Sequence, residues 1–371
     1  MRPAGFLLLA AFHPLPPALA ADPPAVKPSA MVRDLYATDG RMRGVCLVAG
    51  RPVDEAVFSP LVRDNVEWIS QTPFGWMSDA SSREIRIADA SGVYWGETDE
   101  GLAATAQMAH SFGIRTLLKP HLWIAGWQDT VWTGEIKMKS EEAWTQWFES
   151  YRRFILHYAR LAEKEKMEAL AIGTELQGAT LGHEKEWREI IRQVRAVYHG
   201  KLTYAANWDH EFEALPFWDA LDVAGVQAYF PLSEKSDPSL AELIAGWRRH
   251  MATLERVAAR AHRGIVFTEI GYKSSDRASV EPWLWRTEDR INLEQQARCY
   301  ESMFRAVWSK AWFRGVYVWK WYPRFDTRLS VSDRNFTPQG KPAEKILERW
   351  YSRLEAPAAP DFPGIPAGGS P

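Results

Sequence analysis

ALAIGTELQG, residues 169–178, places a glutamate directly after an uninterrupted apolar run. Such a short apolar run predicts a strand that is covered on both faces. Buried strands rarely carry an unpaired acid, because an isolated carboxylate in apolar surroundings is costly. A second stretch, GIVFTEIGYK (264–273), repeats the pattern with Glu269. We therefore expect Glu175 and Glu269 to end two buried strands and to share one site.

Strand-like runs alternate with helical ones along most of the chain. The eight strand candidates are 42–50, 65–76, 114–124, 169–176, 201–208, 220–230, 264–273 and 315–323. Apolar residues at helical spacing predict helices over 98–112, 141–161, 184–199, 239–261 and 292–312. This alternation requires parallel strands joined by right-handed crossovers, and eight strands predict a single-domain α/β fold, a (β/α)₈ TIM barrel. The connections after the first and fifth strands are less clearly helical.

Composition narrows the classes of function. Of 371 residues, 46% are hydrophobic and 25% charged, as expected of a globular protein with a sizeable core. The net charge of −2 gives no electrostatic reason to expect nucleic acid or an anionic membrane as a partner. The 19 Trp residues leave a surplus for a sugar-binding surface. The sequence has neither metal-ligand spacing nor a glycine-rich phosphate loop, so we expect no cofactor, and we expect a monomer.

The two ends of the chain differ from its centre. Residues 1–20 resemble a secretory signal peptide, which predicts a periplasmic or secreted protein; an ordinary disordered terminus is the alternative. Residues 21–37 form a Pro- and Ala-rich linker, residues 38–352 the barrel, and residues 353–371 a disordered tail. The apolar part of the signal is too short to span a bilayer.

Only two cysteines are present, Cys46 and Cys299. They could pair in an exported protein, but both fall in apolar segments of regular structure. We expect two separate buried thiols.

The active site of such a barrel lies at the carboxyl ends of its strands. Strands four and seven, which end in Glu175 and Glu269, are three apart around the ring, so their side chains approach each other across its mouth. The polar and aromatic residues at the ends of the strands are Lys119, His121, Glu175, Asn207, Asp209, Tyr229, Glu269, Trp319 and Trp321.

Two facing carboxylates suit glycoside hydrolysis. At a separation of about 5–5.5 Å, one acts as nucleophile and the other as acid and then base. Their repulsion and the low dielectric raise the pKa of one, which keeps it protonated as the acid. The alternative is that each glutamate only forms a salt bridge with a Lys or Arg at a strand end.

At these residues the chain resembles a clan A glycoside hydrolase, and it is most similar to glycoside hydrolase family 113, the β-mannanase family. The resemblance covers about residues 38–352. It rests on KPHLW (119–123), IGTEL (172–176), LTYAANWD (202–209), WDALDVAGVQAYFPL (218–232), FTEIGYK (267–273) and FTPQGKPAEKIL (336–347).

The resemblance implies a role for each matching residue. Glu175 would be the acid/base and Glu269 the nucleophile, which Tyr229 would orient. Trp319 or Trp321 would lie under the sugar that is cleaved. Further substrate contacts would come from Lys119, His121, Asn207 and Asp209. Apart from the resemblance, Trp76 is also a candidate for a substrate contact.

One position departs from the clan. Many members carry Asn directly before the acid/base, where it holds the sugar 2-hydroxyl; this chain has Thr174 in that substrate-contacting position. This departure puts the preferred sugar and the level of activity in question.

Several of these residues have simpler explanations. Trp76, Trp123 and Trp127 could line subsites or pack loops, His121 could be a satisfied histidine inside the barrel, and Asp209 could pair with His210.

The leading hypothesis is therefore a retaining, endo-acting hydrolase of β-linked polysaccharide, mannan-type by resemblance. The same mechanism on another β-glycan is a second hypothesis, and a non-catalytic carbohydrate-binding barrel is the third.

Overall fold

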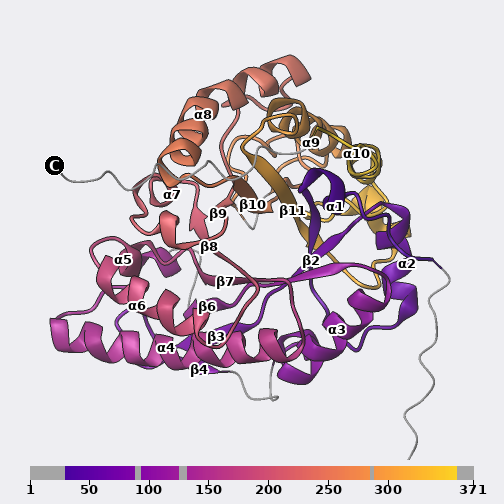
Figure 1. Cartoon of the computed structure of the whole chain (residues 1–371). Coiled ribbons are helices and arrows are strands. Elements are labelled where there is room, and N and C mark those ends of the chain that lie inside the picture. Colours follow the sequence, from indigo (N-terminus) through magenta and orange to yellow (C-terminus); the bar gives the residue numbers. More distant parts are fainter. Residues whose placement is uncertain (1–29, 88–92, 125–131, 285–287, 357–371) are drawn as a thin grey trace, which may run out of the picture.

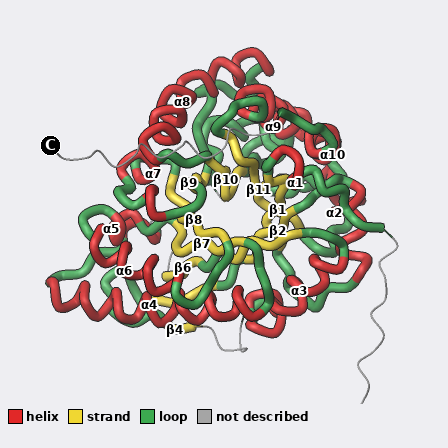
Figure 2. The backbone as a smooth tube through the Cα atoms, viewed as in Figure 1, coloured by secondary structure: helices red, strands yellow, loops and turns green. Residues whose placement is uncertain are grey.

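Eight parallel strands close into a barrel in the order β1-β2-β5-β7-β8-β9-β10-β11, seen end-on in Figures 1 and 2. The computed structural model describes residues 30–87, 93–124, 132–284 and 288–356. The predicted (β/α)₈ TIM barrel is confirmed. The strands are β1 (Met42–Leu47), β2 (Trp68–Gln71), β5 (Arg115–Leu118), β7 (Ala169–Thr174), β8 (Lys201–Asn207), β9 (Ala224–Gln227), β10 (Ile265–Ile270) and β11 (Phe313–Trp321).

Helices surround the strands (Figure 2). The longer ones are α2 (Glu55–Arg63), α3 (Asp99–Ser111), α4 (Glu141–Lys164), α6 (Glu184–Arg195), α8 (Leu240–Ala261), α9 (Leu293–Val307) and α10 (Pro342–Tyr351). Shorter turns are α1 (Tyr36–Asp39), α5 (Gln177–Thr180), α7 (Glu211–Ala214) and the 3₁₀ turns η1 (Trp95–Glu97), η2 (Thr133–Glu135), η3 (Trp218–Ala220) and η4 (Thr327–Ser332).

Polar caps begin the helices that the sequence predicted. The side chains of Thr98, Ser140 and Asn292 each accept a hydrogen bond from a backbone N–H in the first turn. Ser239 and Glu242 form a reciprocal capping box at α8. Helix α2, after the first strand, contains Pro60.

Two predicted strands each divide in two. The stretch 65–76 forms β2 and then β3 (Phe74–Met77), and 114–124 forms β5 and then β6 (His121–Ile124). Strands β3 and β6, with β4 (Arg86–Ile87), make a separate three-stranded sheet. The breaks occur at Pro73 and Pro120, which have no N–H to donate to a ladder. The expectations of a single second strand and a single third strand were therefore wrong, and His121 lies in the small sheet.

Apolar residues fill both faces of the barrel strands. One cluster contains Cys46, Trp68, Ala169, Ala171 and Val266, and the neighbouring residues of the same strands belong to a second cluster that includes the helices. This alternation explains the continuous apolar runs, since both faces of each strand are covered.

Cys46 and Cys299 are free and buried, as expected. The proposed signal peptide, most of the linker and most of the tail lie outside the described residues. Among the helices that the structure describes, none is long and apolar enough to cross a membrane.

Candidate active site

Glu175 and Glu269 lie at the carboxyl ends of β7 and β10, at the mouth of the barrel. The strand register shifts between Ala171 and Thr174 on β7, and between Phe267 and Glu269 on β10. Such irregularities redirect side chains and are common next to active sites. Each glutamate therefore lies where the regular pairing of a buried strand is interrupted.

Glu269 is held from several sides. Its side chain is buried, Tyr229 Oη donates to Oε2 at 2.8 Å, and the ammonium group of Lys119 contacts Oε1. His121 Nε2 lies 3.6 Å from the same oxygen. Lys119 Nζ is also 5.6 Å from the centroid of the Trp319 ring. The carboxylate thus has a full cationic partner and a hydroxyl donor.

Glu175 has neutral donors instead. Asn207 Nδ2 donates to Oε1 at 2.7 Å, and the indole N–H of Trp132 donates to Oε2 at 3.3 Å. The side chain is only partly buried, and its backbone φ is +51°, in the left-handed region that glutamate rarely adopts.

The two carboxyl groups have opposite electrostatics. Burial, together with the charge of Glu269, raises the pKa of Glu175 to about 7. Burial is the largest single effect on Glu269 and raises its pKa, but Lys119 together with His121 and Gln227 brings the net pKa below the ordinary value of 4.5. Near neutral pH one group therefore carries a proton while the other is ionised. This is the pairing that an acid and an anion acting together require.

His121 is a neutral neighbour. Burial and the nearby Lys119 lower its pKa to about 3, although Glu269 opposes them. Its ring stands edge-on to Phe74, at 5.6 Å between centroids. The imidazole is therefore uncharged at working pH values and forms no ion pair with Glu269 there.

The two tryptophans proposed to lie under the sugar differ in their exposure. Trp321 is 1% exposed and packs in the core, so the expectation that it could lie under a sugar was wrong. Trp319 is half-buried beside Lys119. Regular alternation would place both rings on one face, but the pairing of β11 with β1 shifts register between Val318 and Trp321.

Other predicted residues fall at different distances from the pair. The Asp209 side chain is 60% exposed and lies 3.3 Å from His210, which is the simpler pairing foreseen for it. Thr174 is buried, and its hydroxyl donates to the Pro120 carbonyl at 3.4 Å. Trp76 and Trp123 face each other across β3 and β6, 6.0 Å apart, while Trp127 lies outside the described residues.

Comparisons with known proteins show the family of the chain. The model of Glycoside Hydrolase Family 113 matches residues 53–341. The chain belongs to glycoside hydrolase family 113. A comparison with curated proteins finds no match.

Solved structures of the same family are similar over most of this family 113 chain. The GH113 β-mannanase AaManA from Alicyclobacillus acidocaldarius, in complex with ManMIm, is 30% identical with a TM-score of 0.74, covering 84% of this chain and 97% of its own. Two structures of GH113 β-1,4-mannanase are 26% and 27% identical, each with a TM-score of 0.74, covering 84% of this chain and 99% of theirs. The chain is a glycoside hydrolase.

Sequence reasoning missed two neighbours of the glutamates in this family 113 site. Trp132 comes from an irregular segment, and nothing in its local sequence indicates a contact with Glu175. Gln227 is 1% exposed, and its side chain hydrogen-bonds Glu269. It ends strand β9, so the rule that picked out the other polar strand ends would have found it.

The described residues contain no group of three or more His, Cys, Asp or Glu side chains that could hold a metal ion.

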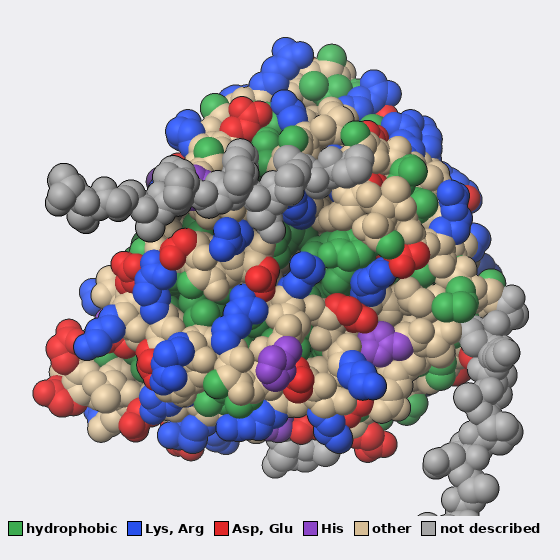
Figure 3. Space-filling model, viewed as in Figure 1, with side chains coloured by type: hydrophobic (Ala, Val, Ile, Leu, Met, Phe, Trp, Pro, Cys, Tyr) green, Lys and Arg blue, Asp and Glu red, His purple; other side chains and the backbone are tan. Residues whose placement is uncertain are grey.

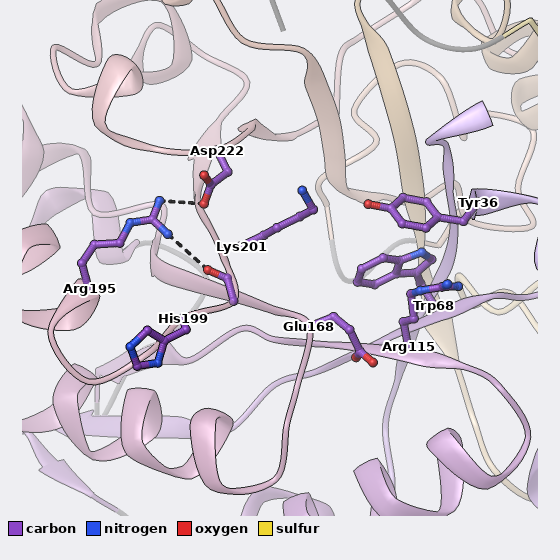
Figure 4. A pocket seen from close by; sticks show the side chains of 9 residues that line it. Tyr36, Trp68, Arg115, Glu168, Arg195, His199, Lys201 and Asp222 are labelled. Atoms are coloured by element: carbon purple, nitrogen blue, oxygen red, sulfur yellow. Dashed lines mark hydrogen bonds and ion pairs between the residues drawn. The ribbon is translucent and has the colours of Figure 1, made fainter. Parts of the chain in front are cut away.

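A cavity of about 500 Å³ lies at the opposite end of the barrel. Its lining includes the first residues of β2, β5 and β8, namely Trp68, Arg115 and Lys201. In Figure 4, Arg195 donates to Asp222 and to a backbone carbonyl across one side of this cavity. Figure 3 shows hydrophobic side chains flanked by Lys and Arg in a hollow near the centre of the same face. Active sites of TIM barrels lie at the carboxyl ends of the strands, and this cavity lies at the amino ends. The cavity is therefore not the candidate active site.

Proposed function

We propose that the protein is a retaining glycoside hydrolase that cleaves β-linked polysaccharide of the mannan type. The observation that carries this proposal is the pair of carboxyl groups at the ends of β7 and β10, of which Glu175 has a raised pKa and Glu269 a lowered one. Membership of family 113 and the likeness to GH113 β-1,4-mannanases support the choice of substrate.

In the first step, Glu269 attacks the anomeric carbon and forms a covalent glycosyl ester, while Glu175 gives its proton to the oxygen of the leaving sugar. The contact of Lys119 with Glu269 keeps the attacking group ionised, and Tyr229 orients it. Both features suit a nucleophile that must be anionic before the reaction begins.

In the second step, Glu175 removes a proton from water, and the water oxygen replaces Glu269 at the anomeric carbon. Esterification has by then removed the negative charge of Glu269, which is one cause of the raised pKa of Glu175. The pKa of Glu175 therefore falls in the intermediate, and the same group becomes a base. The carboxylate of Glu269 is restored at the end.

Substrate contacts follow from the side chains around the pair. Trp319 offers a half-buried aromatic face for the sugar at the cleavage point. The single Thr174 hydroxyl already bonds Pro120, whereas the Asn207 amide bonds Glu175 through one N–H and has a second N–H to offer the sugar 2-hydroxyl. We propose export to the periplasm or the medium, where such polysaccharides are met.

The test is a reducing-sugar assay on mannan, glucan, xylan and galactan with wild type, Glu175→Gln and Glu269→Gln. We expect mannan to be cleaved, with both variants losing at least about 100-fold in kcat while their unfolding curves match wild type. NMR of the first product should show retention of the β-anomer.

Three results would contradict the proposal. Full activity in either variant removes the catalytic assignment, and an inverted first product removes the double displacement. Binding of polysaccharide without release of reducing ends would favour the non-catalytic barrel.

A further inference from the structure

A second acid, Glu211, lies behind Glu175 and is completely buried. It begins α7 and is held by three hydrogen-bond donors. Tyr204 Oη donates to its Oε1 at 2.6 Å and Thr180 Oγ1 donates to the same oxygen at 2.9 Å. The backbone N–H of Asn207 donates to Oε2 at 2.8 Å. A buried carboxylate is tolerated only when its oxygens are satisfied in this way.

Two of these donors lead directly to Glu175. Asn207 hydrogen-bonds the Glu175 side chain through Nδ2, so Glu211 fixes the backbone from which that amide projects. Tyr204 Oη also accepts the backbone N–H of Leu176 at 2.7 Å, the residue that follows Glu175. Glu211 therefore reaches both the side-chain partner of Glu175 and the turn that carries it.

That turn needs support, because Glu175 has a φ of +51°. A non-glycine residue in the left-handed region costs about 1–2 kcal/mol and persists only where its surroundings hold it. The backbone N–H of Glu175 bonds the Ala205 carbonyl at 2.9 Å, and the Leu176 N–H bonds Tyr204. His210, directly before Glu211, also has a positive φ of +63°. Unusual backbone at both ends of one network indicates that its geometry is imposed for function.

We propose that Glu211 is a positioning residue that sets the direction of the Glu175 carboxyl group, through Asn207 on one side and through Tyr204 and Leu176 on the other. This inference rests on the proposed role of Glu175 as acid/base. Glu211 does not touch substrate; it acts through the groups that aim the acid.

Loss of this positioning should slow the reaction of some substrates more than others, according to their leaving groups. An amide at position 211 cannot accept from three donors as a carboxylate does, so in Glu211→Gln the Asn207 segment and the turn at Glu175 shift. A misplaced acid protonates the leaving oxygen poorly, whereas the attack by Glu269 is unaffected. A sugar leaving group needs that proton, but a dinitrophenolate departs without it.

The experiment compares kcat/KM of Glu211→Gln on a mannooligosaccharide and on a dinitrophenyl β-mannooligosaccharide. We expect about a 10–100-fold loss on the oligosaccharide, the scale of a misplacement near 1 Å, and a value close to wild type on the activated substrate. Glu213→Gln, on the same short helix but with a partly exposed side chain, is the matched control and should equal wild type on both.

The ratio between the two substrates does not depend on the fraction of folded enzyme. Equal losses on both substrates would mean a merely structural role and would overturn the inference, as would no loss on either. If Glu211→Gln does not fold, Tyr204→Phe keeps the carboxylate with its Thr180 and Asn207 donors, and removes the hydroxyl that joins Glu211 to Leu176. This variant should lose kcat/KM on the oligosaccharide, by a smaller factor than Glu211→Gln, and keep it on the activated substrate. Equal losses on both substrates would again overturn the inference.

Glu175→Gln, measured with the same two substrates, separates the two levels of the proposal. If it keeps full activity on the oligosaccharide, the acid/base assignment itself fails. If it loses that activity while Glu211→Gln behaves like wild type, only the positioning role fails.

Discussion

At the residue scale, the different partners of Glu175 and Glu269 determine which group carries a proton. Lys119 contacts the buried Glu269 directly, while Glu175 is met by the neutral donors Asn207 and Trp132. Two residues of one chemical type are thereby given two functions by their surroundings.

The pH dependence of kcat/KM on a mannooligosaccharide follows from these surroundings. Activity needs Glu175 protonated, and its pKa of about 7 predicts a fall as the pH rises through 7. It needs Glu269 ionised, so the acid-side fall lies below the ordinary carboxyl value of 4.5. A profile between pH 3 and 10, with circular dichroism at each pH to verify folding, measures both limbs. If the residual activity of Glu175→Gln still falls as the pH rises through 7, that fall belongs to another group.

Lys119→Met tests the cationic partner. Its loss removes the largest of the effects that offset the burial of Glu269, so the pKa of Glu269 rises and the acid limb moves to higher pH. The pKa of Glu175 rises too, since Lys119 also lowers it. We expect a lower kcat/KM at pH 5, measured against Lys185→Met, whose side chain is exposed. An unmoved acid limb would show that Lys119 does not set the charge of Glu269.

At the element scale, the ends of β7 and β10 depart from regular pairing just before each glutamate. The sequence located these strands and their helices well, because apolar periodicity is a local property. It could not reveal the register shifts, which depend on how neighbouring strands pack. Nor did it reveal that Pro73 and Pro120 divide two strand candidates and move His121 into a second sheet, although the prolines themselves are visible.

Gly173 is the tightest point of β7. A Cβ there would lie 2.6 Å from Tyr204 and 2.9 Å from the Tyr151 hydroxyl. We predict that Gly173→Ala lowers the free energy of unfolding by about 1–3 kcal/mol and reduces activity, because Tyr204 also supports the turn at Glu175. Urea unfolding with Gly50→Ala as control checks it, since a Cβ at Gly50 meets nothing closer than 3.5 Å. Equal stability of the two variants would contradict this packing.

At the scale of the whole molecule, a buried charge cluster ties both ends of the described chain to the floor of the barrel. Arg43 on β1 pairs with Asp39 at 2.6 Å and Glu67 at 3.0 Å, and all three side chains are 0% exposed. Arg43 also donates to the Arg353 carbonyl at 2.6 Å, after α10. The cluster lies at the amino-terminal end of the strands, where stability rather than catalysis is expected.

Arg43→Met should destabilise the protein by about 3–5 kcal/mol, because two carboxylates stay buried without their cation. Thermal and urea unfolding measure this effect, and the exposed Arg51→Met is the control. Replacing Asp39 by Asn and Glu67 by Gln in the same variant removes the charges but keeps oxygen acceptors for the backbone N–H groups of Arg41 and Tyr36, so it should recover much of the loss. The kcat at low temperature should stay near wild type throughout. No recovery would mean that Arg43 acts by packing and not by charge.

The sequence by itself determined the eight-strand alternation, the helix caps, the two glutamates at strand ends and the family that they resemble. These are local signals: apolar period, capping residues and short motifs. Only the tertiary structure decided that Trp319 rather than Trp321 is accessible, and that Trp132 and Glu211 join the surroundings of Glu175. Those contacts join segments that are distant in sequence or related by strand register, so they exist only once the barrel has closed.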